Sequence, residues 1–285
     1  MRSRGLLWLL VPLLLLGQGV ILTSAVARRE QLPGRGETLY ALPSPLLKAM
    51  VLEYDGIVSD FIFLRTLVFI GGTFERAERP RVRPQEWDWI RDSLIAATDL
   101  DPWFSDPYYL ANSEMVWDAG RVLDANLLLE KGVHYRTWDW LPPFMAGFNY
   151  YYFLHDNAKA APLLMESARR PGASPVIATL AARLANASDQ TNNAITFLEE
   201  MYQLASDDMS RNLLHERLTA LLDIQALEKA VAMYRERNGV LPERLENLVT
   251  AGVLVRIPVE PYGGRYRLES DGRVVSSSDF GKRAE

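Results

Sequence analysis

The chain has 285 residues, of which 48% are hydrophobic and 24% are charged, a composition typical of a folded protein. A formal net charge of -5, without a dense run of Lys or Arg, argues against binding to the backbone of a nucleic acid. The absence of cysteine excludes disulfides, thiol catalysis, Cys-ligated zinc and an acylated lipoprotein cysteine.

The N-terminus predicts a segment that enters a membrane. Arg2 and Arg4 precede an apolar run over residues 6–27, which at roughly 20 residues is long enough to span a bilayer as a helix. Two interpretations stay open. The segment is either an uncleaved anchor, which we prefer because the run is long, or a signal peptide with a small-residue cleavage site at Ala25-x-Ala27. In either case we expect the body of the chain to be exported to the periplasm.

Residues 28–43 are rich in turn formers, which predicts a linker, and Ser44 or Pro45 then opens a helix. An apolar stretch follows over 46–70, and Gly71-Gly72 predicts its end. Five charged residues interrupt the stretch and favour a helix buried in the body over a second membrane span: Lys48, Glu53, Asp55, Asp60 and Arg65. Unpaired charge is costly in such a helix, so Asp60 and Arg65 should each have a partner or face solvent.

Residues 87–204 show helical periodicity with small residues at regular intervals. Ala160 and Ala194 are 34 positions apart, as are Leu164 and Leu198, while Ala125 and Leu129 precede Ala160 and Leu164 by 35. A period near 34 is that of the tetratricopeptide repeat, a unit of two helices whose small residues allow close packing.

The chain resembles this repeat family most closely over 143–171, and the next unit would cover 175–206. Residues 89–102 resemble the second helix of an earlier unit. The positions that carry the resemblance in the first unit are Gly147, Tyr150 or Tyr151, Ala160, Leu164, Ala168 and Pro171. A longer stretch, which contains residues 59–65, 99–102, 138–140 and 147–150, resembles membrane-anchored repeat proteins of Gram-negative bacteria.

The C-terminal segment has a different pattern. Apolar residues from 214 to 234 predict a long amphipathic helix that Asn238-Gly239 ends, followed by a short helix near Pro242. Two short strands, 266–268 and 273–275, should flank a turn at Asp271-Gly272.

This order of motifs, over 226–278, resembles the globular head of type II secretion major pseudopilins. The resemblance implies one small core against the long helix, built from Tyr234, Leu241, Leu245, Leu248, Ile257 and Tyr266. The chain departs from that family because a repeat domain separates the apolar N-terminus from the head, which favours a docking or capping role over a filament. The acidic cluster that binds calcium in the family is reduced here to Asp271 and Asp279.

Aromatic residues are dense over 108–153. Core packing is the leading interpretation of this region, a groove for a protein or peptide is the second, and glycan chemistry with Asp118, Asp139 and Asp156 is the third. If the region binds a partner, the candidate residues are Tyr109, Trp117, Trp138, Trp140 and Tyr151.

No residue is assigned to catalysis, and no cofactor or metal is expected. His155-Asp156 are adjacent, so on a helix they point about 100° apart, and we interpret them as a turn between helices. The common signatures of nucleotide-binding loops, zinc proteases and serine hydrolases are missing.

The sequence thus predicts a mainly α protein, a tetratricopeptide-like α-superhelix with a small α+β C-terminal module. We expect a non-catalytic scaffold or adaptor, held in the bacterial inner membrane through residues 6–27, that binds an envelope protein or peptide, with a role in secretion or pilus-like assembly. The alternatives are a periplasmic carbohydrate-active enzyme and a pseudopilin-like structural subunit. The expected divisions are 1–27, 28–43, 44–84, 85–206 and 207–285.

Overall fold

The computed structural model describes residues 42–76 and 81–280, together with Gln18 and Ser24. The prediction of a membrane segment over 6–27 therefore falls almost wholly outside the described residues. The chain divides into a unit over 1–40 and a second unit over 41–285, and the helices and strands named below belong to the second.

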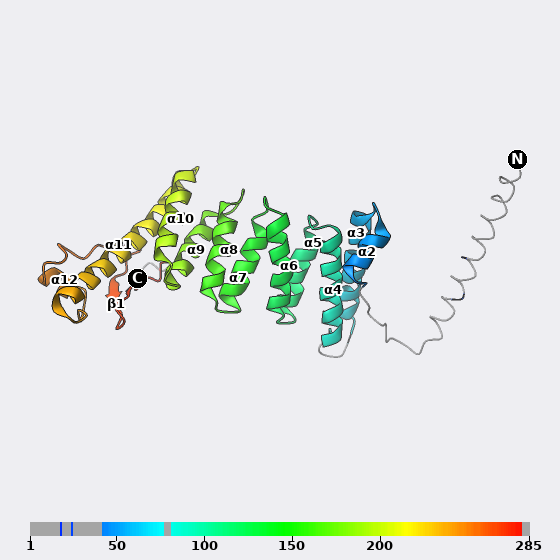
Figure 1. Cartoon of the computed structure of the whole chain (residues 1–285), viewed down its shortest axis with the longest axis horizontal. Helices are drawn as coiled ribbons and strands as arrows, with labels where there is room; N and C mark the ends of the chain where they lie inside the picture. Colours follow the sequence, from blue (N-terminus) through cyan, green and yellow to red (C-terminus); the bar gives the residue numbers. More distant parts are fainter. Residues whose placement is uncertain (1–17, 19–23, 25–41, 77–80, 281–285) are drawn as a thin grey trace, which may run out of the picture. The chain divides into compact units, whose positions relative to one another are not determined.

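The described part of the chain is mainly helical, as predicted (Figure 1). Its helices are α2 (Ser44–Val51), α3 (Asp55–Thr73), α4 (Pro84–Leu100), α5 (Asp106–Leu110), the π-helix η1 (Ala111–Val116), α6 (Val122–Tyr135), α7 (Leu141–Tyr152), α8 (Asn157–Arg169), α9 (Pro175–Ala187), α10 (Thr191–Leu204), α11 (Asp208–Asn238) and α12 (Glu246–Thr250). Its strands are β1 (Tyr266–Leu268) and β2 (Val274–Ser276), which pair antiparallel with Tyr266 opposite Ser276.

Helices that follow one another in the sequence pack together. From α6 to α11 each helix contacts the next, and α9 also contacts α11 (Figure 1). The short connections make neighbouring helices run in opposite directions, so each pair is a helical hairpin.

The periodic small and apolar residues lie in the core of this array. All six of them are fully buried: Ala125 and Leu129 on α6, Ala160 and Leu164 on α8, and Ala194 and Leu198 on α10. Gly147 on α7 faces the second of these helices, where an added Cβ would lie 2.8 Å from Leu164 Cγ. The absence of a side chain at Gly147 therefore allows α7 and α8 to approach closely.

Several helix ends are set by local chemistry that is visible in the sequence. The Asp156 carboxylate accepts a hydrogen bond of 3.0 Å from Lys159 N and caps α8, in the predicted turn. Pro175 occupies the first turn of α9 after the cap residue Ser174. Gly239, with φ of 76°, ends α11 as predicted, because glycine adopts the left-handed conformation without strain.

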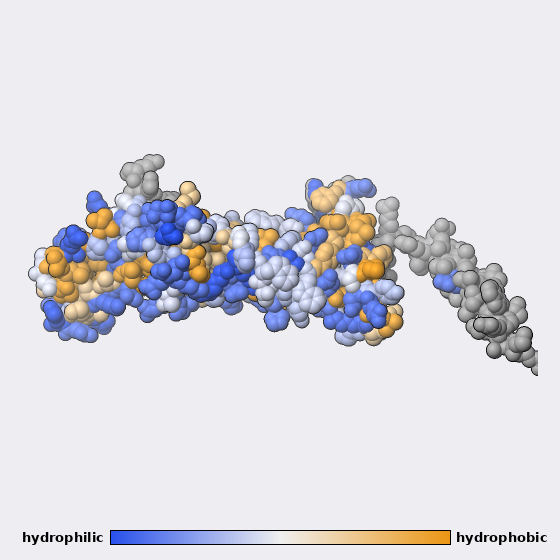
Figure 2. Space-filling view, turned by 90° about the horizontal axis from the view of Figure 1, so that it is seen from above, coloured by the Kyte–Doolittle hydropathy of each residue, from blue (hydrophilic) through white to orange (hydrophobic). Residues whose placement is uncertain are grey.

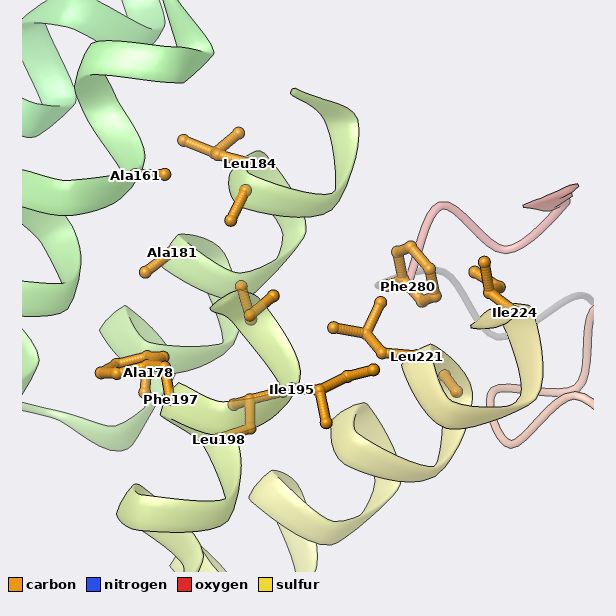
Figure 3. Packing of buried hydrophobic residues seen from close by; sticks show 14 of the residues in the cluster. Ala161, Ala178, Ala181, Leu184, Ile195, Phe197, Leu198, Leu221, Ile224 and Phe280 are labelled. Atoms are coloured by element: carbon orange, nitrogen blue, oxygen red, sulfur yellow. The ribbon is translucent and has the colours of Figure 1, made fainter. Parts of the chain in front are cut away.

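One hydrophobic cluster joins the helical array to the C-terminal segment. In Figure 3, Ile195 and Leu198 of α10 lie near Leu221 of α11, and Phe280 lies near Leu221 and Ile224. The six residues expected in the C-terminal core all belong to this cluster: Leu245, Leu248 and Tyr266 are buried in it, and Tyr234, Leu241 and Ile257 pack against it.

A buried carboxylate organises the loop before the hairpin. Glu260 accepts hydrogen bonds from Tyr262 N (2.8 Å) and Gly264 N (2.7 Å). Its other oxygen accepts from Ser276 Oγ (2.8 Å) and Ser278 Oγ (2.6 Å). Burial alone would raise the pKa of Glu260, but these four hydrogen bonds outweigh it and hold the pKa below its ordinary value.

The expectation of one buried helix over 46–70 is wrong. The helix is interrupted at Leu52, whose φ of 53° ends α2, and α3 continues through Gly71 and Gly72 to Thr73. The described residues of α3 that are buried are Ser59, Thr66, Ile70 and Thr73, whereas half of its large apolar side chains are exposed. By length and composition alone, α3 could cross a membrane.

Candidate functional site

Four aromatic side chains from two segments of the array form an exposed cluster, here called the aromatic cluster: Trp117, Phe148, Tyr152 and Phe153. The rings of Phe148 and Tyr152, one helical turn apart on α7, stack with centroids 5.4 Å apart and planes 9° apart. Trp117 follows η1 and meets Phe153 edge to face at 5.0 Å. Trp117 is 60% exposed and Tyr152 is 53% exposed, so the cluster offers a preformed apolar surface to solvent.

A shallow hollow of about 570 Å³ adjoins this cluster and is here called the aromatic groove. Trp117 belongs to both. Asp106 is the only charged residue among those that line it, so the groove is apolar with one carboxylate and no cation. Its lining residues come from α3, α5, η1 and α7: Phe63, Asp106, Tyr109, Leu110, Asn112, Ser113, Trp117, Leu141 and Met145.

A hydrogen-bonded carboxylate fixes one wall of the groove. Tyr109 Oη donates to Asp139 Oδ2 at 2.7 Å, and Arg136 Nη2 donates to the same oxygen at 2.9 Å. Burial and the hydrogen bond to Asp139 raise the pKa of Tyr109 to about 12. Burial would raise the pKa of Asp139, but the hydrogen bonds from Tyr109, Leu141 and Arg136 outweigh burial and lower the pKa, which favours the carboxylate that holds the tyrosine ring in place.

The π-helix η1 lines another part of the groove, with Asn112 and Ser113. π-Helices are rare, and the wide turn of η1 is anchored by a buried amide. Asn149 Nδ2 on α7 donates to Asn112 Oδ1 at 2.9 Å and to Asn126 Oδ1 at 2.8 Å. This single side chain thus connects α7, η1 and α6, and it fixes Asn112 at the groove wall.

The structure brings together only part of the predicted site. Tyr109 and Trp117 line the same groove, whereas Trp138 is exposed at the turn between α6 and α7, where Arg136 lies over its ring. Trp140 is half-buried, packs on Phe144 and belongs to the core rather than the groove.

Tyr151 lies beside the aromatic cluster, with its ring 6.4 Å from that of Phe148, and its hydroxyl accepts a hydrogen bond of 3.1 Å from Arg183. Phe63 and Met145 were missed as site residues. Phe63 lies more than forty positions before Tyr109 in the sequence, and no local pattern connects α3 to this groove.

The three carboxylates considered for glycan chemistry do not gather at the groove. Asp139 is held by Tyr109 and Arg136, and Asp156 caps α8. Asp118 lies beside Glu114 at a separate hollow of about 230 Å³, where burial and the neighbouring Asp118 raise the pKa of Glu114. Among the described residues, no group of three or more His, Asp or Glu is arranged to hold a metal ion.

A third, polar hollow of about 950 Å³ lies between the α9–α10 turn, α11 and β2. Arg183 and Asp279 form an ion pair of 3.5 Å at its edge.

Comparison with protein families, curated proteins and solved structures found no match to this chain.

Proposed function

We propose that the chain is a non-catalytic scaffold or adaptor of the bacterial cell envelope that binds a segment of a protein partner in the aromatic groove. The observation that carries this proposal is the exposed, stacked aromatic cluster beside an apolar hollow. Aromatic side chains in well-packed apolar hollows dominate the free energy of protein recognition. A set of rigid rings that are already in contact loses little conformational entropy on binding.

The partner's chemistry follows from the lining of the groove. A segment with large apolar side chains would fill the space between Leu110, Leu141 and Met145. Asp106 favours a basic residue at the edge of that segment and disfavours an acidic one. We therefore expect an apolar peptide segment that carries a Lys or Arg.

We infer that the helical array is tetratricopeptide-like. The support is the regular recurrence of fully buried Ala and Leu on α6, α8 and α10 and the glycine contact between α7 and α8. In this interpretation α5–η1 and α7 are the first helices of their units and contribute the binding face, as the concave face of such repeats does.

The C-terminal segment is proposed to be a pseudopilin-like module that docks on or caps the array, which suggests secretion or pilus-like assembly as the pathway. Supporting this, α11 packs on α10 and α9, and the hairpin packs on α11. We further propose that residues 6–27 hold the chain in the inner membrane with its body in the periplasm.

Site-specific photocrosslinking in native membranes tests the function. A benzophenone amino acid at Tyr152 should form a protein adduct that an excess of the identified partner segment abolishes. The same amino acid at Trp138, which is equally exposed at 53% but lies outside both the groove and the aromatic cluster, should not form that adduct. Identical adducts at both positions, or glycan adducts alone, would contradict a groove-bound protein partner.

A further inference from the structure

The outward face of α3 is apolar. Ile57, Phe61, Leu64 and Val68 are 67%, 65%, 55% and 66% exposed. They are spaced by four, three and four residues, so they lie on one stripe of the helix. A helix at the surface of a soluble body carries polar residues there.

The inward face of the same helix carries small hydroxyl residues beside the buried Ile70. Ser59, Thr66 and Thr73 are buried and recur every seven residues. Ser59 Oγ donates to Ala97 O of α4 at 2.9 Å, and the two threonine hydroxyls donate to carbonyl oxygens of α3 itself. In a lipid environment, small hydroxyl residues are favoured where one helix packs on another, and large apolar residues are favoured on the side that faces lipid.

The preceding helix also carries exposed apolar residues. Leu46 and Met50 of α2 are exposed, while Leu47 packs with Ala96 and Leu100 of α4. Figure 2 shows hydrophobic residues gathered at the end of the array that carries α2 and α3. The docking face is defined here as Leu46, Met50, Ile57, Phe61, Leu64 and Val68.

Two charged residues fix how this face meets a membrane. At about 100° per residue, Asp60 and Arg65 lie about 60° and 80° to either side of the stripe centred on Ile57. Both are exposed. In a helix lying in the membrane plane they reach the headgroups, whereas in a spanning helix they would lie in the hydrocarbon centre, where charge is costly. If α3 spanned the membrane, α4 would have to enter it as well, because α4 packs on α3. Helix α4 carries the charged residues Asp88, Arg91 and Asp92.

The length of chain before α2 favours the bilayer as the occupant. Sixteen residues, 28–43, separate the apolar run from the start of α2. Sixteen residues can span at most about 55 Å. If residues 6–27 enter the membrane, the bilayer is therefore always within reach of α2 and α3.

We propose that the docking face of α2 and α3 lies flat on the lipid bilayer, with its apolar side chains at the boundary between headgroups and acyl chains. This inference rests on the proposed membrane insertion of residues 6–27. It assigns the two helices a second membrane contact, which holds the start of the helical array against the lipid surface.

The chain contains no cysteine, so a single introduced thiol reports one position. Leu64→Cys carries an environment-sensitive fluorophore, and Leu204→Cys, at the end of α10 and 68% exposed, is the matched control. Each full chain is incorporated into nanodiscs of phosphatidylethanolamine and phosphatidylglycerol at one chain per disc. Emission is measured with acyl-chain spin-labelled lipid and, separately, with aqueous iodide.

The probe at Leu64 should shift to the blue, lose most of its emission to the spin-labelled lipid and resist iodide, while the probe at Leu204 does the reverse. A Leu64 probe that iodide quenches as strongly as the control overturns the proposal. A probe that resists both quenchers also overturns it, because then a segment of this chain covers the face. Flotation of the same chains with liposomes separates the two levels: a chain that does not float contradicts membrane insertion of residues 6–27, whereas a chain that floats with an iodide-quenched Leu64 probe contradicts only the docking face.

Discussion

The guanidinium of Arg217 donates a hydrogen bond of 2.6 Å to the carbonyl oxygen of Phe280, sixty-three residues later in the chain. It also donates to Tyr262 Oη at 3.2 Å, and its charge lies 4.7 Å from the centre of the Phe280 ring. The side chain is buried, and among the described residues no carboxylate forms an ion pair with it. Arg217 thus fastens the end of the described chain to α11 with hydrogen bonds and ring contacts.

Replacing Arg217 with alanine should lower the free energy of unfolding by about 2–4 kcal/mol, because the Phe280 carbonyl and the Tyr262 hydroxyl lose their donor and a cavity forms. Thermal unfolding followed by circular dichroism measures the change. The control Arg235→Ala, on the exposed side of α11, should cost about 0.5 kcal/mol or less. Equal melting temperatures for the two variants would show that Arg217 does not hold the C-terminal segment.

Glu260 should make the C-terminal segment sensitive to acid. Its folded-state pKa is lowered relative to the unfolded value of about 4.3, so its stabilisation is complete above that value and is lost as the pH falls through the folded-state pKa. Glu260→Gln should therefore destabilise the protein by about 1–3 kcal/mol at neutral pH. The difference from the wild type should shrink as the pH falls from about 5 to about 3.

Denaturant unfolding of both proteins across that pH range provides the measurement. Glu199→Gln, on the exposed face of α10, controls for the loss of a carboxylate. A wild-type advantage that stays constant from neutral pH down to acid would mean that the Glu260 pKa is not lowered by folding.

Gly147 tests how closely α7 and α8 pack. Gly147→Ala places a Cβ 2.8 Å from Leu164 Cγ and 3.2 Å from the Ala160 carbonyl oxygen, so we expect a loss of about 1–3 kcal/mol of stability. Gly71→Ala on α3 meets no atom within 4 Å and should stabilise its helix by up to about 1 kcal/mol. We therefore expect the free energy of unfolding to fall for Gly147→Ala and to rise for Gly71→Ala. An unchanged free energy of unfolding for Gly147→Ala would mean that α7 and α8 can separate without cost.

Trp117 should dominate recognition of the proposed partner. Trp117→Ala removes the shared residue of the aromatic cluster and the groove, and it should weaken binding by about 2 kcal/mol, roughly 30-fold in Kd. Isothermal titration with the crosslinked partner segment measures the affinity. Trp138→Ala should change it by less than about 0.5 kcal/mol, and an equal loss for both variants would place the binding site elsewhere.

The local chemistry of helix ends and the burial of the periodic small residues were predictable because each depends on residues close in sequence. Asp156 and Gly239 end or begin helices through their own side chain or backbone freedom. The core positions Ala160 and Leu164 follow from periodicity alone. By contrast, the prediction of one buried helix over 46–70 was wrong, because an apolar composition does not show which face of a helix a neighbour covers.

The groove itself was only partly predictable for a related reason. Tyr109 and Trp117 are close in sequence, but Phe63 reaches the groove from α3, and its position depends on how α3 packs on α4. The clustering of aromatic residues in the sequence also grouped Trp138 and Trp140 with them, although a turn and a core position separate these two from the groove. A high density of aromatic residues in the sequence does not show toward which part of the fold each side chain points.

The packing of each helix on its sequence neighbour also sets an order of folding events during synthesis. A helical hairpin such as α7–α8 can form as soon as both helices have emerged, since its contacts require no later part of the chain. The contact between Arg217 and Phe280 spans sixty-three residues and cannot form until Phe280 has been synthesised. The array should therefore fold progressively from its N-terminal side, and a chain cut short before Phe280 should retain folded helical hairpins while α11 lacks its closing contact.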